Sequence, residues 1–353
     1  MSRKAPMGRD GRGDQDQTPG RTGPTGRPGR PGVPSRPLKH RPPRVVALGG
    51  GHGLAASLRA LRHVTAELTA VVTVADSGGS SGRLRDEFDC LPPGDLRMAL
   101  AALSGHDEWG VTWREVLQHR LAGDGVLAGH ALGNLLIVGL WEMWPGDPAT
   151  GLDFVGKLVG AEGRVLPMAS VPLDVEADIT RLVDGAEWHT SVRGQAKVAK
   201  ALGRVDAVRL TPPDPPACRQ AVEAIEAADW VVLGPGSWYT SVIPHLLIPE
   251  LAAAVLSERT KRCVTLNLEI QAGETSGYSP ADHLKALGSY APGARFDAVI
   301  VDESSAGDLA ELEDWVSGQG GRLLCRPVRK TGQVGEHDSL RLAAAYREVF
   351  LDG

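Results

Sequence analysis

The sequence predicts an α/β fold built on a doubly wound, mostly parallel sheet with a small antiparallel excursion. From Val45 onward, short apolar runs alternate with helical stretches, and several of the runs end in glycine-rich loops. The runs lack the polar alternation of a half-exposed strand, so we expect each strand to be buried on both faces, as in parallel sheets. A chain of 353 residues is long enough for one large domain of this kind.

The expected elements follow one another as strand, glycine-rich loop and helix. They are strands at 45–48, 68–75, 230–233, 263–268, 296–301 and 322–325, and helices at 54–64, 96–103, 218–228 and 339–350. The segments 175–182 and 187–192 flank an Asp184-Gly185 turn, which indicates an antiparallel hairpin. The stretch before Pro92 is polar, and we expect it to form turns.

The amino-terminal segment differs from the rest of the chain. It is rich in Arg, Pro and Gly and almost free of large apolar side chains, so residues 1–43 are expected to be disordered. Residues 1–44 hold eleven Lys and Arg against three Asp, a net charge of +8, which leaves −13 for the remainder of a chain with a total of −5. An acidic body argues against a nucleic-acid surface on the domain at 44–353. A tail that docks on nucleic acid or an anionic membrane is the alternative to a merely solvated one.

The sequence lacks the motifs that mark several classes of protein. The four cysteines lie far apart with no CxxC pair, so we expect reduced thiols in a cytoplasmic protein. No apolar stretch approaches 18 residues and no signal peptide is recognisable, so neither export nor a membrane span is expected. GxSxG and HExxH motifs are also absent, which leaves hydrolase and zinc-enzyme interpretations without support.

The chemistry is expected on the glycine-rich loops. Backbone N–H groups at a helix start hold phosphates, and glycine permits the close approach. Because the carboxyl ends of parallel strands meet at one edge of a sheet, these loops should form one ligand crevice, to which Gln271–Tyr278 would add a fourth loop. The candidate ligand- and phosphate-binding residues are Gly49, Gly50, Gly51, His52, Gly53, Asp76, Gly78, Gly79, Ser80, Ser81, Arg97, Gly133, Asn134, Gly234, Gly236, Ser237, Tyr239 and Thr240.

Three side chains are candidates for catalysis: Asp76, Asp95 and His130. Asp76 follows the second strand, where doubly wound folds often place an acidic residue against a ribose, although it could also be a turn or capping residue. Asp95 could be a helix N-cap, and Arg97 could clamp an anion. A lone histidine such as His130 is more often structural than catalytic. No metal site is firm; Mg²⁺ held by Asp76 and Asp95 is the candidate.

Six motifs occur in a recognisable order. They are GGGHGL at Gly49, TVADSGGSSGRLR from Thr73, LPPGDLR from Leu91, GHALGNLL from Gly129, LGPGSWYTSVIPHLL from Leu233 and QAGETSGYSPADHL from Gln271. Together they resemble the YvcK-like gluconeogenesis factors of the CofD-like superfamily over nearly all of residues 45–305. The chain departs from the usual pattern at His52, where the family has Thr, at Met98, where it has Asn, and at Trp238, where it has Leu.

The resemblance implies a Rossmann-like core in a cytoplasmic bacterial protein that binds a UDP-sugar. It further implies a gluconeogenesis factor required for cell shape and cell-wall morphogenesis during gluconeogenic growth, and a ligand-binding regulator more than an enzyme. A cell-wall precursor enzyme is then the expected protein partner, and we expect a homo-oligomer. The alternative is a Mg-dependent phosphoryl- or nucleotidyl-group transferase related to 2-phospho-L-lactate transferase. An NAD(P) dehydrogenase is disfavoured because Leu54 stands in place of the third glycine of G-x-G-x-x-G.

Overall fold

The structure is a computed structural model that describes residues 41–183, 186–269, 275 and 277–351. All but the last three residues of the expected tail at 1–43 lie outside this range, as do the turn residues Asp184 and Gly185 and most of the loop Gln271–Tyr278.

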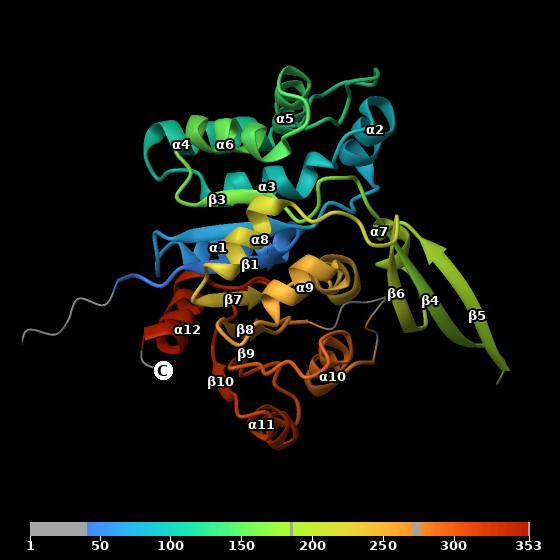
Figure 1. Cartoon of the computed structure of the whole chain (residues 1–353), viewed down its shortest axis with the longest axis vertical. Coiled ribbons are helices and arrows are strands. Elements are labelled where there is room, and N and C mark those ends of the chain that lie inside the picture. Colours follow the sequence, from blue (N-terminus) through green and yellow to red (C-terminus); the bar gives the residue numbers. More distant parts are fainter. Residues whose placement is uncertain (1–40, 184–185, 270–274, 276, 352–353) are drawn as a thin grey trace, which may run out of the picture. The chain divides into compact units, whose positions relative to one another are not determined.

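Within the described residues, the main sheet has seven parallel strands (Figure 1). In spatial order they are β10 (Arg322–Arg326), β9 (Ala298–Asp302), β8 (Lys261–Thr265), β7 (Trp230–Leu233), β1 (Val45–Gly49), β2 (Leu68–Val72) and β3 (Arg164–Pro167). From β1 at the centre, β2 and β3 extend the sheet to one edge, and β7 to β10 extend it to the other edge. Every neighbouring pair of strands is parallel. This is a Rossmann-like order, and the predicted doubly wound sheet is confirmed.

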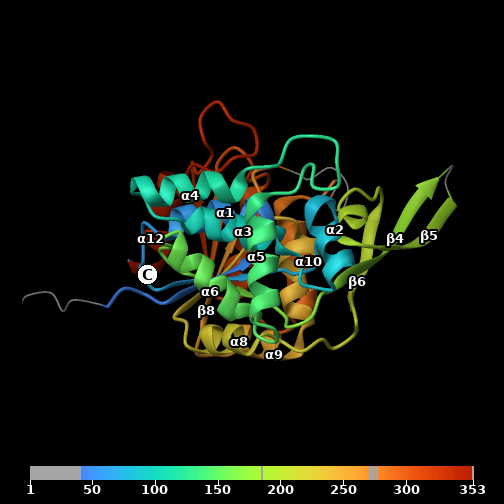
Figure 2. The ribbon, with the colours of Figure 1, turned by 90° about the horizontal axis from the view of Figure 1, so that it is seen from above.

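Helices cover both faces of this sheet. The helices of the described residues are α1 (Gly51–Leu61), α2 (Gly79–Phe88), α3 (Pro93–Leu103), α4 (Glu108–Gln118), α5 (Leu132–Met143), α6 (Pro148–Leu158), α7 (Gln195–Val198), α8 (Arg219–Glu226), the π-helical η1 (Trp238–Val242), the 3₁₀ helix η2 (Ile243–Leu247), α9 (Pro249–Val255), α10 (Pro280–Tyr290), α11 (Leu309–Gly318) and α12 (Ser339–Leu351); of these, α7 packs on the small antiparallel sheet described below. α1 packs against α3 and α12 on one face, whereas α8 and α9 pack together on the other (Figure 2).

The central strands explain why the apolar runs show no alternation. Every residue of β1 is buried, because β2 and β7 flank it in the sheet and helices cover both of its faces. The predicted strands 68–75 and 263–268 end earlier, at Val72 and Thr265. The residues beyond these ends leave the sheet, yet all of them except Asn267 remain buried.

The predicted hairpin is confirmed as part of a small antiparallel sheet. Here β4 (Asp174–Val183) pairs with β5 (Ala186–Arg193) on one side and with β6 (Arg204–Thr211) on the other. The sequence did not predict β6, because a β-bulge between Val205 and Ala207 moves the next buried position to Val208 and breaks the alternation. β5 is largely exposed and projects from the main sheet (Figure 1).

The expectation of turns before Pro92 is wrong, because Gly79–Phe88 forms helix α2. One large apolar side chain, that of Leu84, is buried along this helix, so the sequence shows no apolar stripe there. Tertiary contacts hold the helix instead. Arg85 donates to the carbonyl oxygen of Leu173 at 2.8 Å and pairs with Asp174 at 2.9 Å.

Candidate functional site

The glycine loops after β1 and β7 meet at the topological switch point of the sheet. The chain leaves β1 toward β2 and β3 and returns with β7 on the opposite side of β1, so the winding direction reverses between β1 and β7. Open α/β sheets bind ligands outside the carboxyl ends of the strands at this point. The loop Gly49–Gly53 and the loop Gly234–Gly236 therefore lie where a ligand crevice is expected.

The two loops touch through backbone atoms. A Cβ atom on Gly53 would lie 2.3 Å from the carbonyl oxygen of Pro235 and 2.7 Å from the Cα of Gly236, so only glycine fits there. Gly51 needs glycine for a different reason, its φ of +57°. Asn267, which follows β8, fixes the loop Gly234–Gly236. Its side chain accepts from the N–H of Gly236 and donates to the carbonyl oxygen of Gly236, both at 2.8 Å.

Asp95 lies at the start of α1, although it belongs to α3. Helix α1 begins at Gly51 with Gly50 as N-cap, and a Cβ atom on Gly50 would lie 2.5 Å from a carboxylate oxygen of Asp95. The interpretation of Asp95 as an N-cap is wrong, because Pro92 holds that position in α3. The Asp95 carboxylate accepts from the N–H of Gly51, at a helix end that attracts anions.

Asp76 lies near Asp95 and contributes to a raised pKa of the Asp95 carboxyl group. One Asp76 oxygen accepts from the N–H of Gly78 at 2.9 Å, and the other lies 3.1 Å from where a Cβ on Gly94 would be. Burial, and then the negative charge of Asp76, raise the pKa of Asp95 to about 7. Mg²⁺ between the two carboxylates would relieve this repulsion, with ligand phosphates supplying further oxygens. In the part of the chain that the structure describes, no group of three or more His, Cys, Asp or Glu side chains forms a metal site.

A buried polar network uses four of the predicted side chains. The Arg97 guanidinium, 4% exposed, donates from Nε to Asn134 Oδ1 at 2.9 Å and from a terminal nitrogen to Gln118 Oε1. Asn134 Nδ2 donates to Ser80 Oγ at 3.0 Å, and this hydroxyl contacts His130 Nδ1 at 3.0 Å. Burial lowers the pKa of His130. These bonds join residues near the starts of α2, α3 and α5 to the last residue of α4.

Other predicted residues lie in the turns beside this network. Gly79 begins α2 with a φ of +53°, which favours glycine. The Ser81 hydroxyl lies beside Gly94, where an added Cβ would be only 2.3 Å from it. A Cβ on Gly133 would lie 2.9 Å from the side chain of Arg97. Gly94 and Gly133 therefore allow neighbouring helices to pack closely, whereas Gly79 allows a backbone conformation that other residues rarely adopt.

The predicted hydroxyls after β7 bond within the protein. Ser237 caps η1 by accepting from the N–H of Thr240 at 3.2 Å, and the two hydroxyls also bond to each other. Tyr239 is 3% exposed, and its hydroxyl contacts that of Tyr278 at 2.9 Å. Pro235 and Gly236 of this loop line the cavity described next, whereas Ser237, Tyr239 and Thr240 do not.

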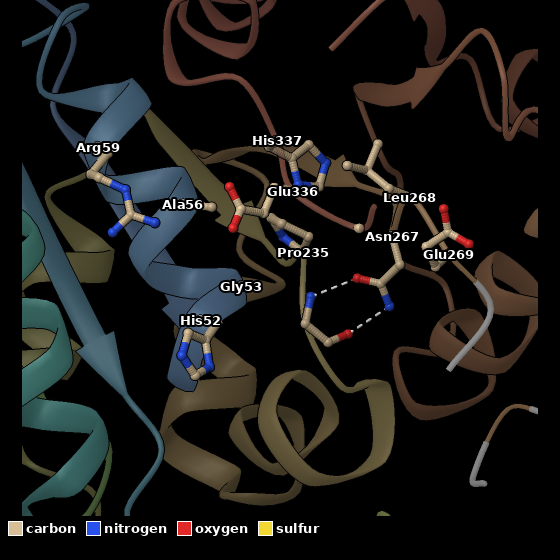
Figure 3. Close-up of a pocket in the computed structure, with 12 residues that line it drawn as sticks. His52, Gly53, Ala56, Arg59, Pro235, Asn267, Leu268, Glu269, Glu336 and His337 are labelled. Carbon is tan, nitrogen blue, oxygen red and sulfur yellow. Dashed lines mark hydrogen bonds between the residues drawn. The ribbon is translucent and has the colours of Figure 1, made fainter. Parts of the chain in front are cut away.

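A cavity of about 270 Å³ opens between the glycine loops and the end of β8 (Figure 3). Among the predicted residues, His52, Gly53 and Gly236 line it. The sequence did not predict its other charged and polar side chains, which are Arg59, Asn267, Glu269, Glu336 and His337. Arg59 could have been found, since it lies seven positions after His52 on the same helix and hence on the same face. The others come from distant segments.

A family model described as 2-phospho-L-lactate transferase CofD matches residues 45–317. The chain belongs to the CofD family. The expected resemblance is thereby confirmed.

CofD-family relatives agree with this result. A Mycobacterium tuberculosis protein named "Putative gluconeogenesis factor" is 54% identical over 269 residues, covering 76% of this chain and 78% of that protein. The "Gluconeogenesis factor" of Bacillus subtilis is 36% identical over 266 residues, covering 75% of this chain and 80% of its own. A crystal structure of a UPF0052 family member from Bacillus halodurans has a TM-score of 0.75 and 35% identity, and covers 87% of this chain and 99% of that one.

Two further expectations for this CofD-family chain concern its thiols and its helices. All four cysteines lie in the described residues as free thiols, with Cys218 and Cys263 buried and Cys90 and Cys325 half-buried. None of the described helices is both long and apolar enough to span a membrane.

Proposed function

We propose that this chain is a gluconeogenesis factor that binds a UDP-sugar in the cavity lined by the loops Gly49–Gly53 and Gly234–Gly236. The observation that carries the proposal is the meeting of Gly50–Gly53 with Gly234–Gly236 at the switch point, where backbone atoms replace side chains. Such a site presents N–H groups to an anion, and the cavity of about 270 Å³ beside the two loops has room for a diphosphate. The names of the relatives support the physiological part of the proposal.

The diphosphate would lie at the amino end of α1. Its oxygens would accept from the N–H groups of His52 and Gly53, since Asp95 accepts from that of Gly51. The positive end of the helix dipole favours this charge. Arg59 lines the same cavity and supplies a cation, whose charge the nearby Glu336 partly offsets. The protein partner would be a cell-wall precursor enzyme, and the occupied state of the crevice would set its activity and thereby cell shape.

Calorimetry on the full chain tests the binding step. UDP-N-acetylglucosamine, GDP and NAD are titrated separately, and the UDP-sugar should bind most tightly. Arg59→Gln should weaken binding several-fold because it removes a cation from the cavity wall. Arg219→Gln is the matched control, since Arg219 lies on α8 and is highly exposed. Absence of UDP-sugar binding to the wild-type chain would refute the proposal.

A second candidate function is a Mg-dependent phosphoryl- or nucleotidyl-group transferase. The close pair of Asp76 and Asp95 favours it, because one or two carboxylates and substrate phosphates suffice to hold Mg²⁺. Phosphorus NMR of UTP, a sugar phosphate and Mg²⁺ with the protein tests for turnover. Product formation that Asp76→Asn abolishes would support the transferase, whereas metal-independent binding without product would favour the regulator.

A further inference from the structure

The small antiparallel sheet has an open edge at β5. The order of the sheet is β5-β4-β6, and among the described residues no strand pairs with the outer edge of β5. All residues of β5 except Val192 are exposed, and the strand projects from the main sheet (Figure 1). An edge strand of this kind presents N–H and carbonyl groups that can pair with a strand of another chain.

The ladder between β4 and β5 shows which backbone groups of β5 point outward. Glu176 stands opposite Arg193, so Val175 and Gly194 are the next opposite pair, and the N–H of Gly194 donates to the carbonyl oxygen of Val175 at 2.8 Å. In an antiparallel ladder, hydrogen-bonded pairs alternate with pairs that are not bonded. The even-numbered residues of β5 therefore bond to β4, and the odd-numbered residues turn their N–H and carbonyl groups outward.

The side chains of β5 are complementary to those of a second copy of the strand. Two copies that pair antiparallel must place odd-numbered residues opposite odd-numbered ones, because only these have outward backbone groups. The register centred on Thr190 meets this condition. It places Glu187 of one copy opposite Arg193 of the other, and Trp188 opposite Val192. A shift of two residues in either direction separates the opposite charges.

Charge and burial both favour this pairing. Cross-strand pairs of opposite charge, and pairs of an aromatic with a β-branched residue, stabilise antiparallel strands, and the two-fold symmetry forms each pair twice. Trp188 is 64% exposed in the single chain, so pairing would remove a large apolar side chain from water. Asp174 accepts from Nε and one terminal nitrogen of Arg193, whose side chain is still 57% exposed. The other terminal nitrogen of Arg193 can therefore meet a second carboxylate.

We propose that this chain forms a homodimer through β5, in which two copies of the strand pair antiparallel about a two-fold axis at Thr190. The two small sheets of three strands then join into one sheet of six. The same residues of both copies form the interface, as in other two-fold dimers. A strand edge is a small interface, so we expect the dimer to dissociate on dilution. The proposal does not depend on the ligand at the glycine loops.

Cysteine cross-linking of the full chain tests the register. Thr190→Cys puts two thiols at the two-fold axis, in a non-hydrogen-bonded pair whose Cα atoms lie about 4.5 Å apart, within the range of a disulfide. Oxidation should therefore give a linked dimer on a non-reducing gel. Ser191→Cys is the matched control, also exposed, but its two copies would lie about 9 Å apart and should not link. No linked dimer with Thr190→Cys, or equal linking of both variants, would overturn the proposal.

Sedimentation over a series of concentrations measures the association itself. Ser191→Pro removes an outward N–H from each copy but leaves the ladder with β4 intact, so it should raise the dissociation constant of the dimer at least about tenfold. Glu187→Lys and Arg193→Glu should each weaken the dimer several-fold, because like charges then stand opposite each other. An equal mixture of these two variants should recover the association, since opposite charges face each other again in the mixed dimer. A wild-type chain that stays monomeric, or a dimer that Ser191→Pro leaves unchanged, would refute the proposal.

Discussion

Replacing Gly53 by alanine places a methyl group where the loop Gly49–Gly53 touches the loop Gly234–Gly236. The new carbon would lie 2.3 Å from the carbonyl oxygen of Pro235, whereas such atoms normally approach to about 3.3 Å, so one loop must move by about 1 Å. Overpacking of this kind costs about 2–3 kcal/mol. Alanine returns up to ~1 kcal/mol through its higher helix propensity, since Gly53 lies in α1. The free energy of unfolding should therefore fall by about 1–2 kcal/mol.

Urea denaturation followed by circular dichroism measures this change, and the melting temperature should fall by about 2–6 °C. Gly139→Ala is the matched control, because Gly139 also lies inside a helix but an added Cβ there meets nothing within 4 Å. This control should be as stable as the wild type or up to ~1 kcal/mol more stable. If Gly53→Ala is stabilised like Gly139→Ala, then the backbone contact between the two loops is not as described.

Further predictions concern Asp95, Arg97 and Tyr346. Because the pKa of Asp95 is raised to about 7 from an ordinary value of 3.8, the folded state binds the proton more tightly, and stability should fall as pH rises between these values. Asp95→Asn should remove this slope and be more stable than the wild type at pH 8 by about 1–2 kcal/mol after screening by solvent; parallel urea titrations at pH 5 and 8 check it, and an unchanged slope contradicts it. Arg97→Glu should cost at least about 3 kcal/mol, because it buries a carboxylate against amide oxygens; wild-type stability in urea would show that the guanidinium is not so enclosed. Tyr346→Phe should cost about 1–2 kcal/mol, since the Ser57 and Thr265 hydroxyls lose a partner at 2.8 and 2.9 Å; a calorimetric melt identical to that of the wild type would contradict this.

The sequence predicted the main sheet because burial on both faces leaves a local signature. The runs at 45–48 and 230–233 contain no polar residue on either face, and glycines follow each of them at once. The small sheet was predicted only at its hairpin, where the turn residues are local. Helix α2 was missed because its stability comes from contacts such as that between Arg85 and Asp174, which lie far apart in the chain.

By itself, therefore, the sequence determined the family, the alternation of strands and helices, and the glycine positions that need backbone freedom, since these depend on neighbouring residues. The tertiary structure decided which loops meet. β7 follows β1 by almost two hundred residues yet lies beside it, and this placement puts Gly53 against Pro235. It also decided that Asp95 reaches the start of α1 and that Arg97 is enclosed by amides. Each of these depends on the distance between side chains from separate elements, and no local pattern encodes that distance.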